Sequence, residues 1–151
     1  MAVTRLQDHF GRPTDGNAKA EVNALIDNTM HAYLGNEPEE LAPHMYAWAA
    51  APNKGAEVWR RMLLNWYGNA PTGSPANDDG GSLGSWVVMA SLGLNHAIPG
   101  VGGFVIGSPW FPSATVRLAG GAVLNINAPA ASDGNMFVQS LNWNGAVYNN
   151  P

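Results

Sequence analysis

The stretch GAEVWRRMLLNWYG, residues 55–68, carries the clearest helix pattern in this 151-residue chain and anchors the interpretation of its neighbours. Arg60 and Arg61 are predicted to face outward, and Gly68 is predicted to end the helix. The apolar residues recur at helical spacing and form one stripe, which consists of Trp59, Met62, Leu63, Trp66 and Tyr67. The stripe indicates an amphipathic helix that buries one face.

Three further segments on either side of this stretch also have helical patterns. AKAEVNALIDNTMHAYL, residues 18–34, places Val22, Leu25, Ile26 and Met30 at helical spacing. LAPHMYAWAA, residues 41–50, is a shorter candidate with Pro43 early in it. SLGSWVVMASLGL, residues 82–94, is apolar nearly all round, so we expect a helix that is buried among other helices.

From about residue 103 onward the pattern changes to that of β-strands. Strands are predicted for FVIGS, ATVRL, AVLNINA and MFVQSLNW, with the second and third joined across Gly120 and Gly121 and with PAASDGN (129–135) as a loop. The predicted class is α+β, with helices over residues 1–100 and a small antiparallel β-region over 101–151. A returning strand is expected after the turn signal Asn144-Gly145, so the sequence is expected to be part of a longer domain with exposed edges.

Composition excludes several functional classes. Charged residues make up only 12% of the chain, the net charge is −4, and the seven Lys and Arg residues are scattered. No basic stripe of the kind that binds nucleic acid is present, so no nucleic-acid partner is expected. The absence of cysteine excludes disulfides and thiolate metal sites. No apolar run reaches signal-peptide length at the N-terminus or transmembrane length elsewhere, so no membrane partner is expected.

The first motif that could bind a ligand or take part in catalysis is Gly35-Asn36-Glu37-Pro38. Pro38 should force Glu37 out of the α region, so that the preceding helix stops near Leu34. A carboxylate at such a break can face a ligand or a cation. Glu39 and Glu40, in contrast, are explained as first-turn residues that are favoured by the dipole of the next helix, an explanation that is preferred for Glu39.

The second motif is Asn77-Asp78-Asp79, which precedes the apolar helix pattern of residues 82–94. One Asn or Asp side chain can cap that helix. Two adjacent carboxylates repel each other unless a cation, a water molecule or a hydrogen-bond network holds them, so a functional role is an equal alternative. The oxygen ligands of both motifs would suit Ca²⁺ or acid–base chemistry at a sugar.

Histidine and aromatic residues are less informative. His9, His31, His44 and His96 lack the spacing of a zinc site, and each is expected to be a surface or hydrogen-bonded helix residue. The Trp and Tyr residues of the helical half are expected to be mostly core, with one or two available to stack on a sugar ring.

Four motifs in order resemble the C-terminal part of glycoside hydrolase family 92, the calcium-dependent exo-acting α-mannosidases. These motifs are GNEP, the segment PANDDGGSLGSW with its helix, FVIGSPWF and VQSLNWNG, and the match covers roughly residues 30–145. The resemblance implies that the chain holds the last helices of an (α/α)6 barrel and the strands that follow it. An N-terminal β-sandwich and the early barrel helices would then be missing partners.

The resemblance also implies roles for individual residues. Asp79 matches the catalytic base of an inverting hydrolase, and Asn77 occupies a position that assists it. Glu37 matches a glutamate near Ca²⁺ and the non-reducing mannose. Asn36 and Asp78 are substrate-binding candidates by their place in the two motifs, although the resemblance gives Asp78 no specific role. The general-acid glutamate of the family lies upstream of this portion, so the isolated chain is expected to be inactive.

Two departures from the family pattern concern specificity. Ser and His commonly follow GNEP in the family, whereas Glu39, Glu40 and Leu41 stand here, and Ala76 replaces the glycine before the NDD motif. The expected substrate is an α-mannoside of an N-glycan-type oligosaccharide, and the intact protein is expected to be secreted or periplasmic. Two alternatives remain at this point: a non-catalytic module that binds carbohydrate or calcium, and one half of a split enzyme.

Overall fold

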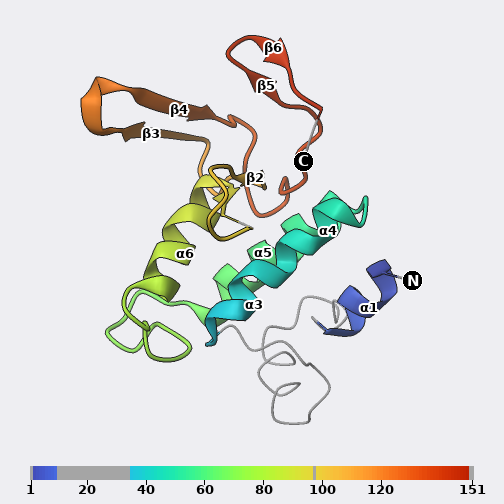
Figure 1. The fold of residues 1–151 in the computed structure, drawn as a ribbon, viewed down its shortest axis with the longest axis vertical. Coiled ribbons are helices and arrows are strands. Elements are labelled where there is room, and N and C mark those ends of the chain that lie inside the picture. The colour runs from blue at the N-terminus through green and yellow to red at the C-terminus, as the bar shows by residue number, and fades with distance from the viewer. Residues whose placement is uncertain (1, 10–34, 97, 150–151) are drawn as a thin grey trace.

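The structure is a computed structural model that describes residues 2–9, 35–96 and 98–149 (Figure 1). The helix predicted for residues 18–34 lies outside these ranges. The helices are α1 (Ala2–His9), α3 (Glu37–Leu41), the 3-10 helix η1 (Ala42–His44), α4 (Met45–Trp48), α5 (Pro52–Trp66), α6 (Ser82–Leu92) and the 3-10 turn η2 (Ala119–Gly121). The strands are β1 (Leu94–Asn95), β2 (Val105–Ile106), β3 (Ser113–Arg117), β4 (Val123–Asn127), β5 (Asn142–Trp143) and β6 (Ala146–Val147).

Helix α5 is the centre of the hydrophobic core, as its sequence pattern predicts. Its buried apolar face packs against α4, α6 and β2, and the core cluster consists of Tyr46, Ala51, Val58, Trp59, Met62, Leu63, Trp86, Ala90 and Val105. Pro52 begins the helix, where the missing N–H costs no hydrogen bond. The helix ends at Trp66 rather than at Gly68, because Tyr67 is extended and the Gly68 N–H donates to the Gly73 carbonyl in the next loop.

The prediction that Arg60 faces outward is wrong. Its side chain is only 3% exposed, and its guanidinium donates a hydrogen bond of 3.0 Å to the Pro109 carbonyl. The same group lies 3.5 Å from the Asp133 carboxylate and 4.9 Å from the centre of the Trp110 ring. The segments after α6 therefore cover this side of α5, a tertiary contact that local periodicity cannot reveal. Arg61 was also predicted to face outward, but its side chain is only 12% exposed and pairs with Glu57 one turn earlier, at 2.9 Å.

Helix α6 was expected to be buried all round, and that expectation is wrong in part. Its buried residues, Leu83, Trp86 and Ala90, form a single stripe at helical spacing. Val88, on another face, is 59% exposed. Within the described ranges, this stripe packs into the core beside α5, and the helix also contacts α3 and β1. An apolar composition alone therefore did not identify the covered side.

The β-region consists of three two-stranded antiparallel sheets in the part of the chain that is described. The predicted hairpin across Gly120 and Gly121 is confirmed, since β3 and β4 pair from Ser113↔Asn127 to Arg117↔Val123. It extends away from the helices (Figure 1). The returning strand predicted after Asn144-Gly145 is also present as β6, which pairs with β5.

The strand predicted for residues 136–143 is mostly wrong, because only Asn142–Trp143 pairs. The rest of that segment pairs with no other strand among the described residues. Alternation of apolar and polar residues is not sufficient for a strand, because a strand also needs backbone hydrogen bonds to a neighbouring strand. The α+β class and the small antiparallel region are thus confirmed. The barrel and the proposed division near residue 100 stay predictions. None of the described helices is long and apolar enough to cross a membrane.

Gly107→Ala is expected to destabilise the chain by about 1–3 kcal/mol or more, because an added methyl group would overlap the ring of Trp59 in the core. The Gly107 N–H also donates to the Gly93 carbonyl at 2.7 Å, so the backbone cannot easily retreat. Urea unfolding measures the effect. The matched control is Gly103→Ala, where nothing lies within 4 Å of the added atom. Equal stability of the two variants would contradict the packing argument.

Candidate functional site

The GNEP motif leads into helix α3. Asn36 is extended (φ −137°, ψ 127°), and Glu37 is already the first helical residue. Pro38 is tolerated because it lies at the second helical position, where its missing N–H would have no partner in any case. The prediction that Pro38 drives Glu37 out of the α region is therefore wrong. The side chains of Asn36 and Glu37 are both exposed.

The NDD motif contains the helix cap that the sequence suggested. The Asp78 carboxylate accepts a hydrogen bond of 2.7 Å from the Gly84 N–H, in the first turn of α6. Its backbone carbonyl also accepts bonds from the N–H groups of Gly81 and Leu83, at 3.2 and 3.4 Å. Asp78 thus satisfies N–H groups that the helix start leaves free, and this role accounts for one of the two adjacent acids.

Asp79 has a backbone conformation that side chains rarely adopt. Its φ is +46°, and Gly80 and Gly81 follow with φ of +72° and +96°, so three consecutive residues are left-handed. Asp and Asn tolerate this region better than other residues with a Cβ, but the conformation still costs stability. The run turns the chain sharply into α6 and leaves Asp79 exposed. Strain of this kind clusters at functional positions, so it supports a role for Asp79 without defining one.

Glu40 joins the two motifs, and the sequence interpretation missed it. Its residue is only 7% exposed, and its Oε2 accepts a hydrogen bond of 3.0 Å from the Ser82 hydroxyl at the start of α6. Its backbone carbonyl accepts a second bond, also of 3.0 Å, from the Trp86 indole N–H. Its other carboxyl oxygen, Oε1, is buried without a hydrogen-bond partner among the residues described. The sequence offered no signal for this burial beyond the helical spacing of Glu40 and the buried His44.

Electrostatic effects show that the structure brings the acidic residues of both motifs together. Burial raises the pKa of Glu40, the Ser82 hydrogen bond opposes that rise, and the charges of Glu37, Asp78 and Asp79 add to it. We call these four carboxylates, Glu37, Glu40, Asp78 and Asp79, the acidic cluster. The side chains of Asn36 and Asn77 make no hydrogen bond within the described part of the chain, and both are exposed.

Tyr67 closes the buried side of the acidic cluster. Its ring stacks on Trp86 with centroids 5.8 Å apart, and its hydroxyl is buried with no hydrogen-bond partner within the described ranges. Burial raises the pKa of Tyr67 strongly, and the charges of Glu40 and Asp78 raise it further. The phenol therefore stays protonated and can only donate or accept a hydrogen bond here.

Two histidines lie within the described residues with their side chains placed, and His44 does not suit an acid–base role at neutral pH. His44, which was expected to be a surface or hydrogen-bonded helix residue, lies in η1 and is buried. Its ring packs edge-on against Trp59, with ring centroids 4.4 Å apart. Burial lowers its pKa to about 3, and the Glu40 backbone carbonyl offsets only part of that effect. His96 is exposed and hydrogen-bonds through its ring to the Val101 carbonyl at 3.0 Å, as expected. The side chain of His9 and all of His31 lie outside what the structure describes.

The donor set for a metal ion is incomplete. No three His, Cys, Asp or Glu side chains converge closely enough to hold an ion within residues 2–9, 35–96 and 98–149. The carboxylate of Glu37 has the ligand chemistry that Ca²⁺ prefers, but alone it does not make a site. The described residues therefore do not fit a complete calcium centre.

Glu40→Gln is expected to flatten the dependence of chain stability on pH. A raised folded-state pKa means that the stabilisation is full below the unfolded pKa of about 4.5 and is lost as pH rises through the folded pKa. Gln cannot ionise, so the variant should lose this slope, which for one proton is at most about 1.4 kcal/mol per pH unit. Unfolding in urea from pH 4 to 8 measures it, with Glu39→Gln as the neighbouring control. An unchanged slope would show that Glu40 does not carry the effect.

Known proteins are similar to this chain in sequence and in fold. The family model described as "Glycosyl hydrolase family 92 catalytic domain" matches residues 1–151. An uncharacterized secreted glycosidase of Arthroderma benhamiae is 32% identical over 133 residues, which cover 85% of this chain and 17% of that protein.

Solved structures from Bacteroides thetaiotaomicron agree. A family GH92 α-mannosidase has a TM-score of 0.81 at 26% identity, over 97% of this chain and 18% of its own. A structure of this enzyme with mannoimidazole has a TM-score of 0.81 at 27% identity, and the match covers 97% of this chain and 19% of that one. A family GH92 inverting mannosidase has a TM-score of 0.83, and the match covers 97% of this chain and 21% of that one. At 24% identity this likeness shows the fold alone. The chain thus spans about a fifth of the length of the proteins that it matches.

Proposed function

The chain belongs to the catalytic-domain family of glycoside hydrolase family 92, and from that premise we propose that it supplies one wall of the active site of an inverting α-mannosidase. The observation that carries the proposal is the convergence of two acidic motifs at the contact between α3 and α6. Glu37 and Asp79 stay exposed at this point, while Glu40 and Asp78 are engaged in structural hydrogen bonds. Two carboxylates are thus free to meet a substrate.

In the proposed mechanism Asp79 is the general base. An inverting glycosidase needs a carboxylate that takes a proton from water on one face of the sugar, while a separate acid protonates the leaving oxygen. The two groups stand about 6.5–9.5 Å apart to admit the water. The left-handed turn before α6 leaves Asp79 exposed to solvent. In this proposal the amide of Asn77, which is also exposed, would orient the same water. The acid would come from a part of the enzyme outside these 151 residues.

We further propose that Glu37 contributes one ligand to Ca²⁺, which would hold sugar hydroxyls when it is bound. Because the described residues contain no three-ligand cluster, the remaining donors would come from elsewhere, and the chain alone should bind calcium weakly. Asn36 and Asp78 would line the same side of the sugar. A mannoside is the proposed substrate because one similar enzyme was solved with mannoimidazole. Export of the intact protein is proposed from the name of the fungal relative, a secreted glycosidase.

An exchange chimera tests the proposal. The segment of the Bacteroides α-mannosidase that superposes on this chain is replaced by residues 1–151, so that the recipient supplies the rest of the pocket. We expect the chimera to hydrolyse 4-nitrophenyl α-mannoside, to release the inverted anomer in early NMR spectra, and to lose activity when EGTA removes calcium. The isolated chain should be inactive, since a base without its acid cannot position the reaction. A folded chimera without activity, or full activity of the isolated chain, would overturn the proposal.

A further inference from the structure

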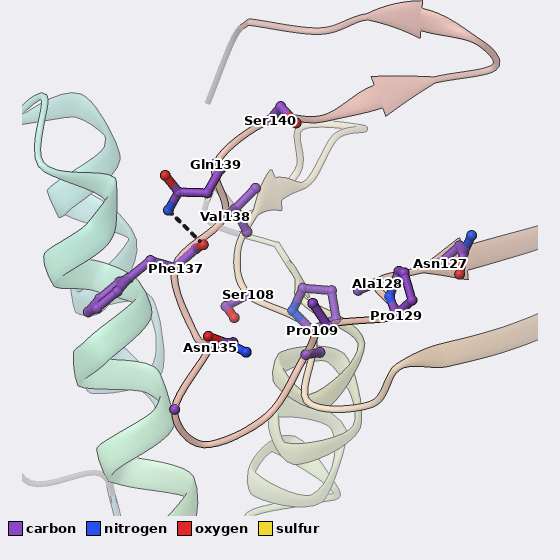
Figure 2. A pocket seen from close by; sticks show the side chains of 13 residues that line it. Ser108, Pro109, Asn127, Ala128, Pro129, Asn135, Phe137, Val138, Gln139 and Ser140 are labelled. Carbon is purple, nitrogen blue, oxygen red and sulfur yellow. Dashed lines mark hydrogen bonds between the residues drawn. The ribbon is translucent and has the colours of Figure 1, made fainter.

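A pocket lies away from the acidic cluster, between three segments that follow α6. It is an open cavity of about 620 Å³, lined by residues 108–109, 127–131, 134–135 and 137–140 (Figure 2). The Asp79 turn precedes α6, whereas Pro109 packs against Gly93 at the other end of that helix. Eleven residues at 1.5 Å each separate the two places by roughly 16 Å. This volume falls within the range of about 300–1,000 Å³ that is usual for small-molecule sites.

The walls of this pocket are fixed by contacts behind them. The buried guanidinium of Arg60 donates to the Pro109 carbonyl at 3.0 Å and pairs with Asp133, in the loop that forms the opposite wall. The Trp110 N–H donates to the Ser91 carbonyl at 2.9 Å, which ties the same segment to α6. The Ala128 N–H donates to the Pro112 carbonyl at 2.8 Å. Since the backbone is held by these contacts, the lining side chains are available for a ligand.

The lining combines polar and apolar residues and carries no charged side chain. Its polar side chains are hydroxyls and amides, those of Ser108, Asn127, Asn135, Gln139 and Ser140. Gln139 donates to the Phe137 carbonyl at 3.0 Å, while Ser108 and Asn135 make no side-chain hydrogen bond to other described residues. In Figure 2, Ser108 and Asn135 lie between Pro109 and the segment of Phe137, whose ring points away toward a helix. The apolar part of the lining comes from proline, alanine and valine.

This chemistry selects one class of ligand. A phosphate, carboxylate or ammonium group would leave its charge unpaired against such a lining, at a high cost in desolvation. Hydroxyl and amide groups both donate and accept hydrogen bonds, as sugar hydroxyls do, and proline and valine can cover the C–H faces of a ring. We propose that this pocket is a binding site for a neutral saccharide, separate from the acidic cluster and independent of the function proposed above.

NMR titration of the ¹⁵N-labelled 151-residue chain tests the site. The neutral probes are methyl α-mannoside and cellobiose, and the charged ones are glucuronate and glucose 6-phosphate. We expect a neutral probe to shift the side-chain amide signals of Asn127 and Asn135 saturably, and the charged probes to bind at least tenfold more weakly. Loss of one hydrogen bond in Asn135→Ala or Ser108→Ala should weaken binding about three- to tenfold. Asn69→Ala, an exposed position outside the pocket, should leave it unchanged.

The same titration identifies the outcomes that would overturn the proposal. One is the absence of saturable shifts up to the solubility limit of both neutral probes. Another is unchanged affinity in both pocket variants, each checked for a native-like spectrum. Shifts confined to the Asp79 turn would place saccharide binding in the candidate active site instead, and repeating the titration with Asp79→Asn separates the two. Failure here leaves the activity of the chimera unaffected, so the two proposals are distinguishable.

Discussion

Asp79→Asn is expected to lower the rate of α-mannoside hydrolysis by the exchange chimera about 10²- to 10⁴-fold, the usual contribution of a general base. The amide has the shape of the carboxylate but cannot take a proton from water. Asn also tolerates the left-handed backbone that Asp79 adopts at φ +46°, so the turn into α6 should persist. The fall should therefore appear in kcat, with little change in thermal unfolding.

A matched control separates loss of a base from loss of a negative charge on the surface. Asp133→Asn makes the same chemical change at a side chain that is 73% exposed and lies outside the acidic cluster. Because Asp133 pairs with the buried Arg60, this control is compared below its own unfolding temperature, where it should retain activity. Asp79→Gly adds a second test, because glycine relieves the left-handed strain and should preserve or raise stability while abolishing hydrolysis. A chimera with Asp79→Asn that keeps more than a tenth of its activity would exclude Asp79 as the base.

Local patterns were sufficient to predict the elements whose stability is decided locally. The apolar stripe of α5 and the Gly120-Gly121 hairpin were both identified correctly, because periodicity and turn chemistry act within a few residues. The same reasoning failed for Arg60. Its partners, the Pro109 carbonyl and Asp133, are 49 and 73 residues away along the chain, and no local pattern encodes such a contact.

The candidate site shows the same division between local and tertiary information. Capping chemistry predicted that one residue of the NDD motif would serve α6, and Asp78 does so through the Gly84 N–H. The burial of Glu40 was missed, since acidic residues in the first turn of a helix are ordinarily solvated. Only the packing of α3 on α6 places this carboxyl against Ser82 and under Trp86. The roles given to Asp79 and Glu37 rest on family resemblance and stay predictions.

Trp86→Ala is expected to have the largest effect on stability, about 3–5 kcal/mol, because it empties a large core site. The residue is 5% exposed, stacks on Tyr67 and donates to the Glu40 carbonyl, so it links the core to the acidic cluster. A domain of this size has a free energy of unfolding of about 5–15 kcal/mol. The variant should therefore unfold at much lower urea concentration, and circular dichroism during urea titration measures the shift.

A second variant separates the stability lost with the indole ring of Trp86 from the stability lost with its N–H hydrogen bond. Trp86→Phe keeps an aromatic ring beside Tyr67 but leaves the Glu40 carbonyl without its donor, which should cost about 1–3 kcal/mol for an unsatisfied buried group. Leu64→Ala, at a position of α5 that is 48% exposed, should change stability far less than either. If Phe is as damaging as Ala, the hydrogen bond to α3 dominates. If Trp86→Ala costs no more than Leu64→Ala, the contact between α3 and α6 does not hold this fold together, and the juxtaposition of the two acidic motifs loses its structural basis.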